Sequence, residues 1–300
     1  MSTGGIRLRR SERYWLWLFL APTVFGLLFG SLGPVLAAIG ISFTEWDVIT
    51  TPEFAGLENY QRLLSDPTFR KALANTAYYV GIMVPASTIL GLLLALVMNQ
   101  KLRGITGYRT AYFLPVVSST VAVALVWSWI YAKDFGLLNY LLRGVGLQPV
   151  NWLSSSRSAM PAVILMAVWG TLGQSMIIFL AGLQSISQSY YEAAEVDGAN
   201  AVQRFFNITL PLITPSLFFY FIIEMISAFQ TFEQIYVMTR GGPANATTTV
   251  VYYIYRNAFR NFKMGYGSAL AWVLFVLIAA LTYLQFRTSR RWVFYEGVEM

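Results

Sequence analysis

Several polar side chains interrupt long apolar blocks of this sequence, and their chemistry is the most informative. Glu224 lies about 12 residues into the apolar block 212–238, where burying a charge costs at least about 2.5–3.5 kcal/mol. Ser227 and Thr231 follow at helical spacing and should share its face. A carboxylate beside hydroxyls suits a solute that presents hydroxyl groups. For any single Ser or Thr, the alternative is a hydrogen bond between neighbouring helices.

Two other apolar blocks carry polar side chains at a comparable depth. Those groups are Ser118, Ser119 and Thr120 in block 112–131 and Thr171, Gln174 and Ser175 in block 160–182. Nearby aromatic rings, Trp127, Trp169 and Phe229, could stack on the faces of a sugar. Transporters place their substrate where such groups converge near the bilayer midplane.

The same inventory excludes several kinds of enzyme. The chain has no Cys and no His, so it has no thiolate or imidazole metal site and no Cys nucleophile or His base. Glu224 and Glu233 are nine residues apart, about 13 Å along a helix, which is too far for a catalytic carboxylate pair. No lysine follows a glycine, so a phosphate-binding loop is absent.

The composition indicates an integral membrane protein. Hydrophobic residues make up 56% and charged residues 12% of the 300 residues, against about 25% charged in soluble domains. Six apolar blocks are long enough to cross a hydrocarbon core, which takes about 20 residues. Their limits are 14–43, 72–98, 112–131, 160–182, 212–238 and 268–286. The net charge of +7 is spread beside these blocks, which suits anionic membrane lipid and not nucleic acid.

The basic residues do not decide alone which way the chain crosses the bilayer. Eleven Lys and Arg fall in the segments predicted to lie inside and ten in the outer loops. Four arginines precede the first block and three follow the sixth, and charges next to the first span weigh most. We therefore expect both termini in the cytoplasm. The outer loop 239–267 is aromatic-rich and expected to be structured, and on the residues alone it would form a lid of interfacial aromatic side chains.

The polar segment 184–215 separates the fourth and fifth blocks. Residues 185–196 favour a helix, Asp197-Gly198 supplies a turn, and 201–209 can begin a second helix that leads into the next span. Ala193 and Ala194 are small enough to let another surface approach closely. A docking surface and a solvated acidic helix without a partner both fit these features.

The segment resembles the EAA loop of binding-protein-dependent ABC importers. The matching residues are Glu192-Ala193-Ala194, Asp197-Gly198-Ala199, Phe205, Ile208, Leu210-Pro211 and Pro215. A second stretch, with Thr239-Arg240-Gly241-Gly242-Pro243 and Gly265-Tyr266-Gly267-Ser268-Ala269, is similar to the carbohydrate-uptake branch, the maltose and glycerol-phosphate type. The resemblance extends over most of the chain and is weakest in the first loop.

The resemblance implies an all-α membrane protein of six spans, with a cytoplasmic coupling helix between the fourth and fifth. The chain would be a permease subunit in the cytoplasmic membrane, and not an enzyme. It would pair with a homologous second permease, an ATP-binding subunit dimer that holds ATP-Mg, and an extracytoplasmic solute-binding protein. The residues coupling it to the ATPase would be Glu192, Ala193, Ala194, Asp197, Gly198, Ala199 and Pro211.

The resemblance also implies a solute pocket. Positions Thr120, Thr171, Gln174, Glu224, Ser227 and Ala228 correspond to those lining the sugar site of the maltose type, with different side chains. A sugar or polyol is the expected solute. Two alternatives stay open, an ion-coupled secondary transporter that uses Glu224 as its ion site and an ABC permease for another solute class. The expected organisation is a basic tail 1–13, a permease domain 14–286 with a coupling loop 184–211, and a cytoplasmic tail 287–300.

Overall fold

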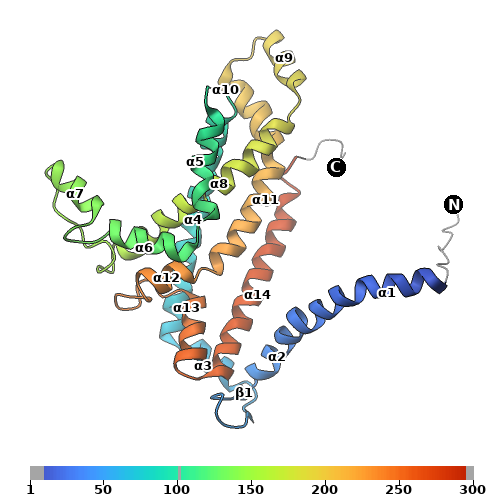
Figure 1. The fold of residues 1–300 in the computed structure, drawn as a ribbon, viewed down its shortest axis with the longest axis vertical. Coiled ribbons are helices and arrows are strands. Elements are labelled where there is room, and N and C mark those ends of the chain that lie inside the picture. Colours follow the sequence, from blue (N-terminus) through green and yellow to red (C-terminus); the bar gives the residue numbers. More distant parts are fainter. Residues whose placement is uncertain (1–9, 101–102, 295–300) are drawn as a thin grey trace. The chain divides into compact units, whose positions relative to one another are not determined.

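The computed structural model describes residues 10–100 and 103–294. Most of the predicted basic tail 1–13 and the end of the predicted tail 287–300 lie outside these residues. The chain forms two units. The first comprises residues up to 65 together with 256–273, and the second comprises 66–255 together with the residues from 274 onward. Helices dominate both units, as the composition predicts (Figure 1).

The first unit begins with one long apolar helical stretch. α1 (Arg10–Phe25), η1 (Gly26–Leu32) and α2 (Gly33–Ser42) follow one another without a break. A short hairpin of β1 (Thr44–Glu45) and β2 (Glu53–Phe54) and the helix α3 (Glu58–Ser65) come next. The Asn59 side chain donates to the carbonyls of Ser42 and Thr44, 3.0 and 2.9 Å away, and so fastens α3 to the end of α2. η3 (Arg256–Arg260) and the start of α14 (Met264–Ser289) complete this unit.

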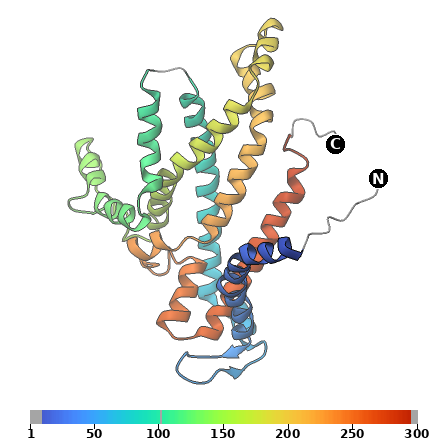
Figure 2. The same ribbon diagram turned by 45° about the vertical axis from the view of Figure 1, so that its right-hand side comes forward.

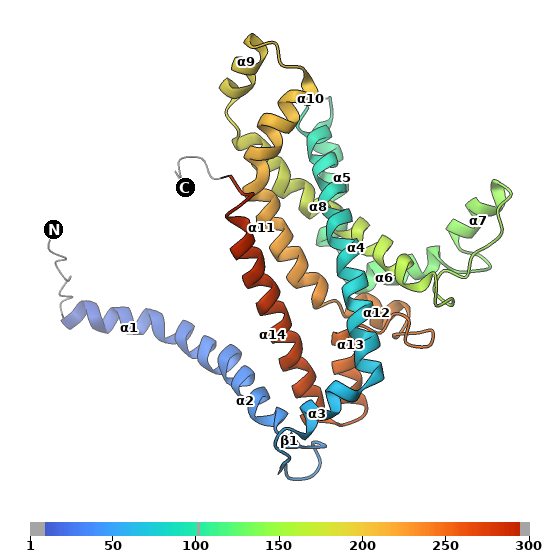
Figure 3. The same ribbon diagram turned by 180° about the vertical axis from the view of Figure 1, so that it is seen from behind.

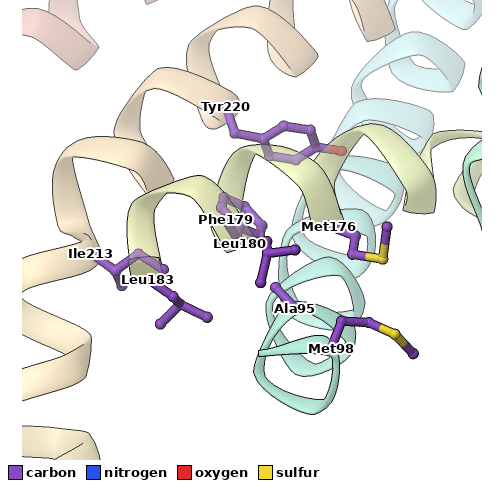
Figure 4. Packing of buried hydrophobic residues seen from close by; sticks show 8 residues of the cluster. All are labelled: Ala95, Met98, Met176, Phe179, Leu180, Leu183, Ile213 and Tyr220. Carbon is purple, nitrogen blue, oxygen red and sulfur yellow. The ribbon is translucent and has the colours of Figure 1, made fainter. Parts of the chain in front are cut away.

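The second unit is built around α4 (Pro67–Met98), α8 (Ala159–Ser185) and α11 (Leu210–Phe229), which lie side by side (Figure 2). Their shared core contains the buried residues Ala95, Met98, Met176, Phe179, Leu180, Leu183, Ile213 and Tyr220 (Figure 4). Shorter helices surround them: α5 (Ile105–Val117), α6 (Thr120–Ile130), α7 (Leu137–Gly144), α9 (Gln188–Val196), α10 (Ala201–Arg204), η2 (Phe205–Thr209), α12 (Glu233–Met238) and α13 (Val250–Tyr255).

Small residues let three helices approach α8 closely. A methyl group at Gly173 of α8 would lie 2.3 Å from the carbonyl oxygen of Tyr112 on α5. One at Gly91 of α4 would lie 2.1 Å from Ser175 Oγ, and one at Gly182 would lie 2.3 Å from Ser216 Oγ of α11. Helix pairs in membranes pack through such small residues because lipid gives them no hydrophobic drive to associate.

Within residues 10–100 and 103–294, five helices are long and apolar enough to span a membrane, and the pair α5 and α6 would make a sixth if counted together. The span predicted over 112–131 therefore corresponds to a bent pair of helices and not to a single straight helix. α5 begins at Ile105, the chain is extended at Ser118 and Ser119, and α6 leaves at 101°. Pro115, which lacks an N–H and crowds the preceding turn, stands just before the bend.

The fifth predicted block, 212–238, also differs from a single helix. The helical stretch begins earlier, at Ala201, and α11 ends at Phe229. Residues 230–232 are not helical, and α12 starts at Glu233. The expectation that Thr231 continues the helical face of Glu224 is consequently wrong.

Candidate functional site

Two adjoining cavities lie where α5, α6, α8, α11 and α12 meet. The small cavity has a volume of about 220 Å³, and its lining is Pro115, Val116, Ser118, Thr120, Val123, Met166, Ala167, Gly170, Thr171, Gln174, Ser227 and Gln234. The bend at Ser118 exposes the start of α6 to this space. Its polar lining consists of hydroxyls and two amides, which can donate hydrogen bonds to a solute and accept them from it.

The large cavity has a volume of about 560 Å³ and shares Thr120, Ser227 and Gln234 with the small one. The rest of its lining is Ile223, Ile226 and the consecutive residues 230–233. The break between α11 and α12 thus forms much of its wall. Together the two cavities offer a polar surface of the size that a small ligand needs.

Four of the six predicted pocket residues come together here. Thr120, Thr171, Gln174 and Ser227 line the small cavity. The Thr171 hydroxyl also donates to the carbonyls of Ala167 and Val168 on its own helix, at 3.2 Å each. It would therefore offer a solute mainly its acceptor capacity.

The other two predicted residues, Glu224 and Ala228, are buried away from both cavities. Each is 3% exposed and belongs to neither lining. Glu224 and Ser227 are three residues apart, about 60° around a helix, and this turn is enough to direct one inward and the other toward the cavities. Glu224 interacts electrostatically with the hydroxyls of Tyr220, one turn before it, and Tyr79 of α4.

A polar chain connects Glu224 to the cavities. Gln234 lines both cavities, and its Nε2 donates a long 3.5 Å hydrogen bond to the Tyr79 hydroxyl. The Thr231 side chain is 5% exposed and lies near Tyr79, yet its hydroxyl has no partner with hydrogen-bond geometry among the described residues. Sequence reasoning gave no role to Gln234. The sequence does hold a sign of this break, because polar residues at 230–231 and 233–234 interrupt an apolar block that is longer than a membrane span requires.

The aromatic residues proposed for stacking lie elsewhere. Trp127 and Trp169 pack edge to face, with ring centroids 5.6 Å apart, and Phe229 is buried. Phe232 is the aromatic residue in the lining of the large cavity, and Tyr236, Tyr252 and Tyr255 support its ring. The best stacking face therefore belongs to Phe232, a residue that sequence reasoning did not select.

The predicted helix, turn and helix of the polar segment are confirmed. α9 begins after Ser187, whose hydroxyl accepts a hydrogen bond from Ser189 N–H. The turn at Gly198 has φ of +76°, a conformation that glycine adopts without steric cost. A capping box between Asn200 and Gln203 then starts α10. From Ala201 the helix runs without interruption through η2 and α11 (Figure 3).

Side-chain contacts fasten α9 to the start of that long helix. Arg204 and Glu195 form an ion pair across the turn. The Tyr191 hydroxyl is hydrogen-bonded to Thr209 Oγ1 at 3.0 Å, where η2 becomes α11. Two bonds in different directions make α9 a projection held at a defined angle.

The surface of this projection is open to a partner. α9 has no buried residue, and Glu192, Ala193, Asp197 and Gly198 are exposed, while Ala194 and Ala199 are half-buried. Pro211 lies in the first turn of α11. Exposed apolar side chains that sequence reasoning missed, Val196, Val202 and Phe206, surround the turn, and Val196 is 89% exposed. They suit a protein interface better than a solvated acidic helix.

The opposite end of the second unit is tied to the segment that precedes α13. Lys71 Nζ donates to the carbonyl of Ala244 at 2.7 Å, and Asn75 Nδ2 donates to that of Asn245 at 2.8 Å. The Val250 N–H donates to Thr76 Oγ1, 3.0 Å away. These bonds confirm that residues 239–255 are structured, as expected for that loop.

Comparisons with known proteins give one consistent result. The family model described as "Binding-protein-dependent transport system inner membrane component" matches residues 71–293. The probable ABC transporter permease YesP of Bacillus subtilis is 41% identical, covering 94% of this chain and 92% of the relative. The trehalose/maltose transport system permease MalF of Thermococcus litoralis is 36% identical, covering 95% and 96%. A crystal structure of a bacterial alginate ABC transporter, with its alginate-bound periplasmic protein, gives a TM-score of 0.83 at 25% identity, covering 94% of this chain and 96% of that one.

Proposed function

This chain belongs to the family of inner membrane components of binding-protein-dependent transport systems, and from that premise we propose that it carries a sugar or polyol. It is the permease subunit of an ABC importer, with several helices long and apolar enough to span a membrane, and ATP hydrolysis would belong to a separate subunit. A sugar is supported by the cargo named for its relatives and by cavities lined with hydroxyls, amides and one aromatic face.

The solute would pass through the two cavities. Thr120, Gln174 and Ser227 would bind its hydroxyls, and Phe232 would stack on a ring. Thr171 would accept hydrogen bonds, because its proton is already committed to its own helix. Glu224 and Ala228 would act from behind the lining, with Glu224 setting the orientation of Gln234 through Tyr79. A homologous second permease would supply the other half of the pathway.

Transport would be driven from the α9 projection. Two ATP-binding subunits holding ATP-Mg would receive Glu192, Ala193, Ala194, Asp197, Gly198 and Ala199 in a cleft, with both termini of this chain on the same cytoplasmic side. A pull on α9 passes through the ion pair and the Tyr191–Thr209 bond into the helix that starts at Ala201. Pro211 lies within that helix, whose far end carries Ser227. An extracytoplasmic binding protein would deliver the solute at the other end, near residues 239–255.

The observation that carries this proposal is the uninterrupted helix from Ala201 to Phe229, because it joins the exposed projection to the cavity lining. Ala193→Trp would add bulk to the exposed face of α9 without touching the cavities. We expect the assembled transporter to lose its ATPase subunits during purification and to lose solute uptake. Leu141→Trp on exposed α7 adds similar bulk elsewhere and serves as the control. Full uptake by Ala193→Trp, or uptake without any ATPase subunit as an ion-coupled carrier would show, refutes the proposal.

A further inference from the structure

The segment that breaks the fifth span forms a ligand-facing surface of its own. Gln230, Thr231, Phe232, Glu233 and Gln234 are consecutive, and all five line the large cavity. We propose that this segment, called the hinge subsite below, is a second solute-recognition subsite, which binds a pair of neighbouring hydroxyls and disfavours anionic solutes. The proposal rests on the proposed function, and it adds the class of solute and the residues that select it.

An unpaired buried hydroxyl supports a ligand at this subsite. Thr231 is 5% exposed, lies in the cavity lining, and its hydroxyl has no hydrogen-bond partner among the described residues. Buried polar atoms in native proteins are nearly always paired, by protein or by a bound molecule. The hydroxyl oxygen itself is shielded and lies near Tyr79, so a solute hydroxyl in the large cavity would satisfy it after a small shift of the Thr231 side chain.

The functional groups beside Thr231 match a diol. The Glu233 carboxylate accepts hydrogen bonds only, while the Gln234 amide both donates and accepts them. Tyr79 holds Gln234 through the 3.5 Å bond to its Nε2, which leaves the amide oxygen free to accept. Phe232, supported by three tyrosine rings, provides an apolar face on the same segment. A ring with two adjacent hydroxyls could place one against Glu233 and one against Gln234.

The charge of the lining determines which solutes are disfavoured. Among the described residues that line the two cavities, Glu233 is the single charged side chain, and no Lys or Arg takes part. A solute carboxylate would therefore meet a like charge with no compensating cation. The solved transporter that resembles this chain imports alginate, an acidic polysaccharide. We infer that this chain takes neutral solutes, although its fold is similar.

The absence of cysteine from the sequence allows a direct test in the assembled transporter in proteoliposomes. Gln230→Cys would place one thiol in the hinge subsite, to react with a cationic trimethylammonium methanethiosulfonate or with the anionic sulfonate reagent. The readout is the mass of this chain. Because a thiol reacts as its anion and so favours the cationic reagent anywhere, the ratio of the two rates is compared with that at Leu141→Cys on α7. We expect the ratio at Gln230→Cys to be at least about threefold higher, since opposite charges attract over this distance, and adding Glu233→Gln should bring it to the Leu141→Cys value. A ratio equal to that of Leu141→Cys, or an excess that survives Glu233→Gln, would overturn the charge selection.

A second arm separates this inference from the proposed function. Neutral malto-, cello- and xylo-oligosaccharides, with oligogalacturonides as anionic counterparts, would be tested for uptake and for protection of two cysteines, Gln230→Cys and Gln174→Cys. We expect a neutral member to be taken up and to slow labelling at both positions at least about threefold, as occupancy near saturation requires. Protection at Gln174→Cys alone overturns the hinge subsite and leaves the proposed function standing. Uptake of galacturonides equal to that of neutral sugars overturns the selectivity, and uptake of no saccharide refutes the proposed function.

Discussion

The two breaks that flank α11 differ in how they are built. The break before it, at Asp197-Gly198, has a glycine in the left-handed region, a capping box and an ion pair across the turn. The break after it, at residues 230–232, has no glycine, no proline and a buried hydroxyl without a hydrogen-bond partner in the part of the chain that the structure describes. Side chains beside the first break pair with one another, whereas residues of the second break line the large cavity. This contrast fits the proposal that the first break transmits force from a partner and the second binds solute.

The largest expected effect comes from straining the first break. Gly198→Val forces a β-branched residue to a φ of +76°, a conformation that costs L-residues about 1–2 kcal/mol even without branching. We expect α9 to lose its angle and solute uptake to fall at least about tenfold, in keeping with that strain. Uptake into proteoliposomes measures it. Gly107→Val on α5, where a methyl group would have nothing within 4 Å, is the control. Normal uptake in Gly198→Val would show that the angle of α9 does not matter.

A somewhat smaller effect is expected from the buried carboxyl behind the second break. Glu224→Ala removes a group that interacts with Tyr79 and Tyr220, and partners left unpaired in a buried site cost about 1–3 kcal/mol. We expect uptake to fall about tenfold, while the complex with its ATPase still assembles, and Glu224→Gln to retain more activity. Purification and transport kinetics test both parts. Unchanged kinetics in Glu224→Ala would remove this residue from the site.

Loss of one hydrogen bond should weaken transmission without abolishing it. Tyr191→Phe removes the bond to Thr209, which is worth about 0.5–1.5 kcal/mol. We expect about two- to fivefold less solute transported per ATP hydrolysed, with the ATPase rate itself maintained. Tyr140→Phe on exposed α7 is the matched control. An unchanged ratio of transport to hydrolysis would mean that the bond plays no part in coupling.

The smallest effect is expected from the ion pair on the projection. Glu195→Gln breaks its pairing with Arg204, but Glu195 is exposed, and surface pairs contribute about 0–1 kcal/mol. We expect transport to change by less than about twofold at physiological salt, because salt screens such pairs. Uptake measured from low to high ionic strength should show the difference shrinking. A large loss that persists in high salt would assign Glu195 a direct contact with a partner.

The first break was predictable from the sequence because local signals determine it. Asp197-Gly198 and the Asn200–Gln203 capping box act within a few residues of the turn, so the predicted helix, turn and helix were confirmed. The number of apolar blocks followed from composition for a similar reason. Contacts with a partner, and the roles of Glu192 and Ala193, stay predictions, since they depend on another molecule.

The second break was not predictable because distant residues hold it. The Thr231 carbonyl accepts a hydrogen bond at 3.2 Å from Thr249, 18 residues later. This hydrogen bond takes the place of one within a helix, and it forms only when the folded chain brings Thr249 to Thr231. The prediction that Glu224 lines the pocket was wrong for a related reason. Helical spacing placed it with Ser227, but the packing of α11 against α4 buries one and exposes the other.

The small residues around α8 limit how this protein can move. Sliding α4 along α8 would drive larger side chains into Ser175, and sliding α11 or α5 would drive Ser216 or the Tyr112 backbone into larger side chains of α8, since not even a methyl group fits at these contacts. Neighbouring helices can therefore tilt against α8, but these contacts block their sliding along its axis. Under the proposed function, a movement delivered at α9 would therefore reach the cavities as a tilt of α11, and the length of the helix that starts at Ala201 would set the size of the opening.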